Sequence, residues 1–187
     1  MHDNTKQVTS LLRKHFLIHS DPHVNENGEV DVPGLVQMRT PMAQLPVKFG
    51  TVKDFSCNGM KLRSLTGAPH TVHANFTCRN NQLQSLEGAP QHVEFTFMCD
   101  HNPLKSLKGL PKHVGSEVVL TWNEQLPLMQ LFFLKPNLGI NLLGAPPEVA
   151  DLFDRQKHPE LYGGGRQAII KAVPILIKAG YSKNAHL

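Results

Sequence analysis

The sequence predicts an α+β repeat protein, a short solenoid that carries a parallel sheet and has a helical cap at each end. The main observation is a pattern of Phe, Cys, Leu, Gly and Pro that occurs three times, in residues 55–72, 76–93 and 97–114. Its cysteine recurs every 21 residues, at Cys57, Cys78 and Cys99. A unit this short cannot bury its own apolar face, so the units must stack. The flanking segments lose the pattern and show helical spacing of apolar residues, which predicts the caps.

Each repeat divides into a strand and two turns. The Phe-x-Cys segment alternates as a strand does, so we expect the strands of successive repeats to lie parallel and adjacent. Asparagines follow three of these strands, and we expect their side chains to tie the first turn to the backbone at Asn81, Asn102 and Asn123. Met60 takes this position in the first repeat. Gly-Ala-Pro or Gly-Leu-Pro then turns the chain toward the next strand.

The repeats form the centre of a single domain that covers residues 1–187. Its N-terminal cap over 1–34 begins with an amphipathic helix at residues 5–18, and a tight turn follows at Asn27 and Gly28. The solenoid itself covers 35–125. It opens with a degenerate coil, in which Met42 and Leu45 take the places of Leu62 and Leu65.

The helical C-terminal cap covers residues 126–187. We expect it to contain a short strand with the sequence GINLL and helices over 147–156 and 166–179. Pro174 lies within the last of these helices and predicts a kink or a break there.

Composition and cysteine usage favour a cytoplasmic protein. No apolar run approaches the roughly 18 residues of a membrane-spanning helix, and the N-terminus lacks the apolar core of a signal peptide. The three cysteines share one repeat position, where we expect them to point inward as a reduced packing ladder. A disulfide or a metal site is the alternative, although no CxxC spacing is present.

The pattern FxCxxNxLxSLxGAPxxV resembles the short leucine-rich-type repeats of many bacteriophage-encoded proteins of unassigned function. The segments NENGEVDV, LPVKFGTV and AIIKAVPILIKAGYSKNAHL resemble the leader and tail of the same proteins, so the resemblance covers most of the chain. It implies a leucine-rich-repeat-like solenoid encoded by a phage. It supplies no shared catalytic residue, and Met60 and the segment Thr121-Trp122 depart from the pattern.

Function is expected on the exposed face of the sheet. Residues that alternate with the inward Phe and Cys should line this face: Asp54, Ser56, Asn58, Asn75, Thr77, Arg79, Thr96, Met98, Asp100, Glu117, Val119 and Thr121. We call this set of twelve the strand face. Its mixed polar and apolar character suits protein recognition, with Arg79 and Met98 as candidate anchors. The alternative is that Arg79 and Asp100 only pair with each other across adjacent strands.

These features predict a binding module and no enzyme. No nucleophile elbow, zincin, kinase or dinucleotide motif is present, and we expect no cofactor and no metal. The expected partner is a host protein, bound by a monomer or homodimer that acts as a phage accessory, host-takeover or anti-defence factor. Nucleic acid is the alternative partner, because the net charge is +4 and lysines lie on the turn side at Lys61, Lys105, Lys108 and Lys112.

Overall fold

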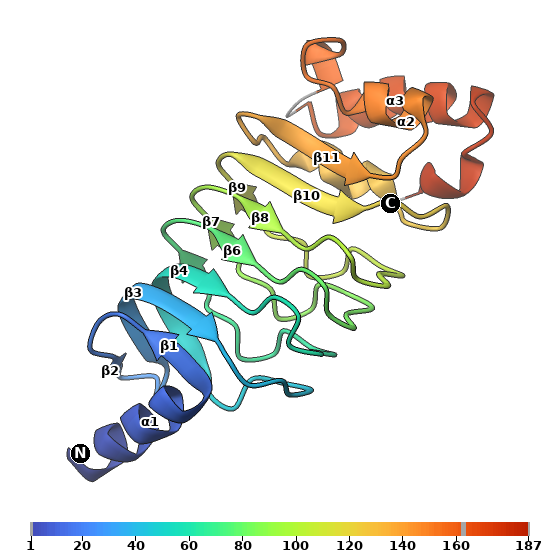
Figure 1. Cartoon of the computed structure of the whole chain (residues 1–187). Coiled ribbons are helices and arrows are strands. Elements are labelled where there is room, and N and C mark those ends of the chain that lie inside the picture. Colours follow the sequence, from blue (N-terminus) through green and yellow to red (C-terminus); the bar gives the residue numbers. More distant parts are fainter. Residues whose placement is uncertain (1, 162–163, 187) are drawn as a thin grey trace.

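The chain forms a parallel β-solenoid of about five turns with helices at both ends (Figure 1). The computed structural model describes residues 2–161 and 164–186. All its strands belong to one sheet, and the strands of the solenoid follow one another along the sequence: β3 (Val30–Met38), β4 (Phe49–Ser56), β5 (Thr71–Val72), β6 (Phe76–Thr77), β7 (His92–Val93), β8 (Phe97–Met98), β9 (His113–Val114), β10 (Glu117–Thr121) and β11 (Gly139–Leu143). The predicted fold class is therefore confirmed.

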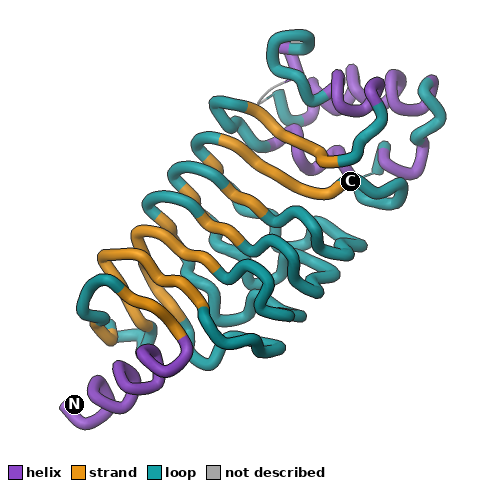
Figure 2. Tube along the Cα trace, in the orientation of Figure 1, coloured by secondary structure: helices purple, strands orange, loops and turns teal. Residues whose placement is uncertain are grey.

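The repeats stack in register, as the period predicts. Strand β4 is long enough to pair with both short strands of the next coil, β5 and β6. Phe55, Phe76 and Phe97 are successive partners across parallel strands, and Phe97 is opposite Val118 of β10. Figure 2 shows that the strands occupy one side of each coil and that loops complete the rest.

The core is a ladder of identical side chains. The rings of Phe55 and Phe76, and those of Phe76 and Phe97, are stacked with centroids 5.6 Å apart. The leucines of the Leu-x-x-Leu segments are fully or almost fully buried beside them: Leu62, Leu65, Leu83, Leu86, Leu104 and Leu107. Repeated contacts of the same kind explain why units of 21 residues suffice for a continuous core.

The three cysteines are free thiols and fully buried next to the phenylalanine ladder. Burial raises the pKa of the Cys57 and Cys78 thiols well above the usual range, because a thiolate would lose its hydration there. The expectation of a packing ladder of reduced cysteines is confirmed.

We predict that a thiol reagent such as Ellman's reagent reacts with none of the 3 cysteines within minutes in the folded protein and with all 3 after denaturation. The absorbance of the released thiolate measures both. Rapid reaction of the native protein would show that the cysteines are accessible and would contradict the buried ladder.

The predicted asparagine ties are present. Asn81 Nδ2 donates to the carbonyl oxygens of Cys57 and Cys78 at 2.8 and 3.0 Å, and its Oδ1 accepts from the backbone N–H of Met60 and Leu62 at 3.0 Å each. The asparagine of one coil thus also fixes the turn of the preceding coil. Met60 keeps its turn without an asparagine because Asn81 supplies the bonds.

The second turn depends on glycine. Gly67, Gly88 and Gly109 all have positive φ, between 86° and 93°. A Cβ at Gly88 would also lie 2.6 Å from the backbone of Leu65 in the coil below. Only glycine fits this conformation and this close approach, which accounts for its place in the repeat.

The N-terminal cap differs from the sequence prediction at both ends of its helix, which begins at His2 and not at residue 5. Helix α1 (His2–His15) ends three residues earlier than expected, and Phe16–Ile18 form strand β1, antiparallel to β3. The edge of β3 would otherwise leave backbone groups unpaired, and pairing with it overrides the helical spacing of Phe16. The predicted turn at Asn27 and Gly28 is confirmed, since it joins β2 (His23–Val24) to β3.

The C-terminal cap contains the predicted strand β11 and several short helices. They are η1 (Leu128–Phe133), α2 (Pro147–Leu152), η2 (Pro159–Leu161), α3 (Arg166–Lys178) and η3 (Ser182–Asn184). The predicted helix over 147–156 is shorter, and α3 continues through Pro174 without a break. Asn184 is fully buried, and its Nδ2 donates to the carbonyl oxygens of Asn123 and Leu126 at 3.1 and 2.9 Å. It therefore closes the last coil.

Candidate protein-binding surface

The strand face lies on the outer side of β4, β6, β8 and β10, the strands visible along the body in Figure 1. Phe and Cys point into the core, and the intervening residues point outward, as the alternation predicts. Ten of the twelve predicted residues are half-buried or exposed. The structure therefore brings most of the predicted residues to one continuous surface.

Asp100 is an exception, because its side chain is 0% exposed. Its carboxylate lies 2.8 Å from Arg79 Nε, and its Oδ2 lies 2.6 Å from His101 Nδ1. The side chains of Arg79 and His101 cover the carboxylate from two sides, so the expectation that Asp100 is available to a partner is wrong. Arg79 and Asp100 do pair across adjacent coils, as the alternative expected.

Val119 is the second exception, with 7% of its surface exposed. It lies in β10 between Met98 of β8 and Asn141 of β11. Since neighbours on both sides cover it, Val119 offers little contact area at the surface. The sequence did not show that the GINLL segment extends the sheet past this residue.

Polar side chains of the strand face bond to one another. Asn58 Nδ2 donates to Thr77 Oγ1 at 3.1 Å, and Asn58 Oδ1 accepts from the backbone N–H of Arg79 at 2.8 Å. Asp54 Oδ2 accepts from Asn75 Nδ2 at 3.2 Å, and Asn75 Oδ1 accepts from the backbone N–H of Thr96 at 3.3 Å. These bonds hold the polar rows in fixed positions, so the surface is pre-organised.

Two exposed apolar side chains lie at the margin of the strand face and were missed in the sequence. Phe95 is 54% exposed and Leu138 is 75% exposed. Backbone bonds place them in one row: Ser116 N–H donates to Phe95 O at 2.9 Å, and Leu138 N–H donates to Ser116 O at 2.8 Å. The signal for Phe95 is the repeat itself, because the equivalent residues are Ala74 and Ser116. We use the name apolar strip for Phe95 and Leu138 of this row together with Met98, a half-buried residue of β8 in the neighbouring row of the strand face.

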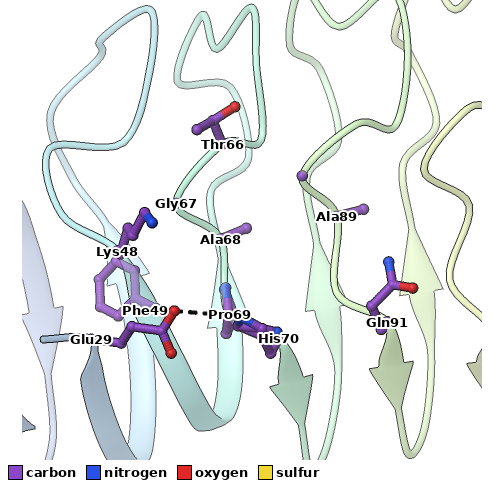
Figure 3. A pocket seen from close by; sticks show the side chains of 11 residues that line it. Glu29, Lys48, Phe49, Thr66, Gly67, Ala68, Pro69, His70, Ala89 and Gln91 are labelled. Atoms are coloured by element: carbon purple, nitrogen blue, oxygen red, sulfur yellow. Dashed lines mark ion pairs between the residues drawn. The ribbon is translucent and has the colours of Figure 1, made fainter. Parts of the chain in front are cut away.

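The opposite side of the coils carries a shallow pocket of about 250 Å³ (Figure 3). Two Gly-Ala-Pro turns line it, together with Glu29, Lys48 and His70. Glu29 Oε1 and His70 Nε2 lie 3.4 Å apart, and Thr66 points away from them. Glu29 and His70 therefore face each other in this pocket, and the Thr66 side chain lies away from the imidazole.

One lysine of the turn side, Lys108, pairs with an acidic residue of the adjacent coil. Lys108 Nζ lies 2.7 Å from Glu87 Oε1 in the adjacent coil. This pair raises the pKa of Lys108 and lowers that of Glu87, each through the hydrogen bond between them. Lys108 is therefore one turn-side lysine whose charge is offset by a carboxylate of the neighbouring coil.

Two further findings concern the described part of the chain, residues 2–161 and 164–186. No group of three or more His, Cys, Asp or Glu side chains in it could hold a metal ion. None of its helices has the length and apolar character needed to cross a membrane.

In-register strands, a stacked core and capped ends define this protein as a parallel β-solenoid with an exposed, pre-organised strand face. No family model, no curated protein and no solved structure matches the chain.

Proposed function

We propose that this protein is a non-enzymatic binding module that attaches to another protein through its strand face. The observation that carries the proposal is the apolar strip, set at the margin of a surface whose polar groups are already bonded to one another. Phe95 and Leu138 are more than half exposed, and Ser116 lies between them in the row that the backbone bonds form across the coils. Neither residue is needed to fill the core.

The chemistry of the surface fits a protein partner. Aromatic residues and methionine are enriched at protein interfaces, where a few such side chains carry most of the binding energy. Glu94 lies beside Phe95 in the sequence, and Glu117 occupies the position of Thr96 in the next coil. These two carboxylates supply a polar rim. Arg79 remains partly exposed, but its guanidinium is committed to Asp100, so we assign the anchoring role to the apolar strip.

The repeat resembles those of bacteriophage proteins, and we therefore extend the proposal to a role during phage infection. The protein acts in the host cytoplasm as an accessory, host-takeover or anti-defence factor. It inhibits a host protein by covering part of that protein's surface, which requires area and no catalysis. A solenoid suits this role because its repeats provide a long, flat contact surface.

Differential capture from a lysate of the host bacterium tests the proposal. Tagged wild-type protein and the variant Phe95→Ser/Leu138→Ser are immobilised in parallel, and bound proteins are identified by mass spectrometry. We expect at least one protein that the wild type retains, that nuclease treatment does not release, and that the variant loses. Retention that disappears with nuclease, or that is equal for both proteins, contradicts the proposal.

A further inference from the structure

The second unassigned surface is the outer side of α3, at the C-terminal end of the molecule. Ile170 is 65% exposed and Ile177 is 54% exposed, and the exposed Pro174 lies between them. Residues at i, i+4 and i+7 fall on one side of a helix, so these three form a continuous apolar ridge. We call it the α3 ridge.

The fold does not need this ridge. The other side of α3 contacts η1, η2 and η3, and it buries Ala168, Ala172 and Leu176 almost completely. Small alanines let the helix lie close to the cap. The isoleucines on the outer side therefore remain as large apolar groups without a role in the packing of this chain.

The segment that carries the ridge is basic, and the acidic Glu160 of η2 lies close enough to Lys171 to interact with it. Residues 161–187 contain no Asp or Glu, and they contain Arg166, Lys171, Lys178 and Lys183. Lys171 and Lys178 follow Ile170 and Ile177 directly and are exposed beside them. Two acidic side chains of the cap, Asp151 and Glu160, already pair with Lys157 and His158. The complementary surface must therefore be negatively charged and must accept isoleucine.

We propose that α3 docks in the plane of an anionic lipid bilayer surface. The α3 ridge enters the boundary between headgroups and acyl chains, and the lysines contact lipid phosphates, as in other interfacial amphipathic helices. Nucleic acid would satisfy the lysines but gives no apolar environment to the isoleucines. A second copy of this chain would bring cations of the same sign together across a two-fold axis, which is unfavourable.

Position in the molecule makes docking compatible with the proposed function. Figure 1 shows α3 beyond β11, at the opposite end of the solenoid from α1. The strand face runs along the body between these ends. A protein attached to a bilayer through α3 would still present its strand face to a partner. The two proposals rest on different residues and are tested separately.

Vesicle sedimentation tests the inference with the whole protein. Vesicles of phosphatidylcholine mixed with phosphatidylglycerol are compared with vesicles of phosphatidylcholine alone, at low and high salt. We expect wild-type protein to bind the mixed vesicles at low salt and to dissociate as salt rises. The variants Ile170→Ser/Ile177→Ser and Lys171→Glu/Lys178→Glu should each bind about tenfold more weakly or worse.

Lys105→Glu/Lys112→Glu is the matched control, because it makes the same change in net charge on the turn side. It should bind nearly as the wild type does, and all variants should keep the circular dichroism spectrum and melting temperature of the wild type. The inference is overturned if wild type ignores mixed vesicles, if folded ridge variants bind as it does, or if the control loses as much binding. It is also overturned if wild type is a dimer that the isoleucine variant dissociates, since a second copy would then cover the ridge.

Discussion

Replacing Asn102 with alanine should lower the free energy of unfolding by about 3 kcal/mol. Asn102 Nδ2 donates to the carbonyl oxygens of Cys78 and Cys99 at 2.9 and 3.0 Å, and its Oδ1 accepts from Leu83 N–H at 3.1 Å. The substitution leaves the Cys99 carbonyl and the Leu83 N–H without this partner, while the Cys78 carbonyl keeps its bond from Asn81. Each unpaired buried group costs about 1–3 kcal/mol. Urea denaturation followed by circular dichroism measures the change.

Asn141→Ala is the control for this experiment. Asn141 is an exposed asparagine of β11 in the same sheet, and its removal should change stability by less than about 0.5 kcal/mol. If Asn102→Ala were as stable as this control, the asparagine ties would not hold the coils together, and the account of the repeat would be wrong.

The second large effect concerns binding. The variant Phe95→Ser/Met98→Ser/Leu138→Ser should weaken binding of the captured partner by about 100-fold or more, because an apolar anchor that a partner covers often contributes about 2 kcal/mol. Stability should change little, since Phe95 and Leu138 are exposed and Met98 is only partly buried. Surface plasmon resonance with the purified partner gives the affinity, and a thermal melt confirms the fold.

Ile170→Ser/Ile177→Ser serves as its control, because it also replaces exposed apolar side chains with serine but lies in α3. Equal loss of binding by both variants would indicate a general effect of surface hydrophobicity. Unchanged binding by the folded triple variant would exclude the apolar strip as the site.

The solenoid was predictable because its signal is repeated. Cys57 and Phe55 each have counterparts at fixed spacing, so a wrong assignment of structure in one coil would disagree with the other coils and can be corrected. The asparagine ties followed from the same logic, since a small polar residue after a strand has few partners besides the turn backbone. Inward and outward alternation then placed ten of the twelve strand-face residues correctly at the surface.

The features that the sequence did not predict depend on contacts that do not recur with the period of the repeat. Asp100 appeared exposed because alternation gives a direction and does not show that Arg79 and His101 fold over it. Phe16 continues the helical spacing of apolar residues, yet it pairs with the edge of β3 as the first residue of β1. Asn184 donates a hydrogen bond to the backbone of Asn123, which lies 61 positions earlier in the sequence, and no local sequence pattern predicts such a contact.

The apolar strip was predictable from the sequence only in part. Phe95 occupies a position that is alanine in one coil and serine in the next, so comparison of the repeats marks it as unusual. Leu138 lies outside the repeat, and only the backbone bond to Ser116 brings it into the same row. The residues that differ between coils are therefore the ones on which the proposed function rests.

Site-specific photocrosslinking tests the central claim, that the strand face is the surface that contacts a partner. A photoreactive phenylalanine analogue is placed at Met98 on the strand face and, in a separate protein, at Arg63 on the turn side, and both are irradiated in host lysate. The account predicts a discrete crosslinked protein from position 98 and none from position 63. A crosslink from position 63 alone, or equal crosslinks from both, would contradict it.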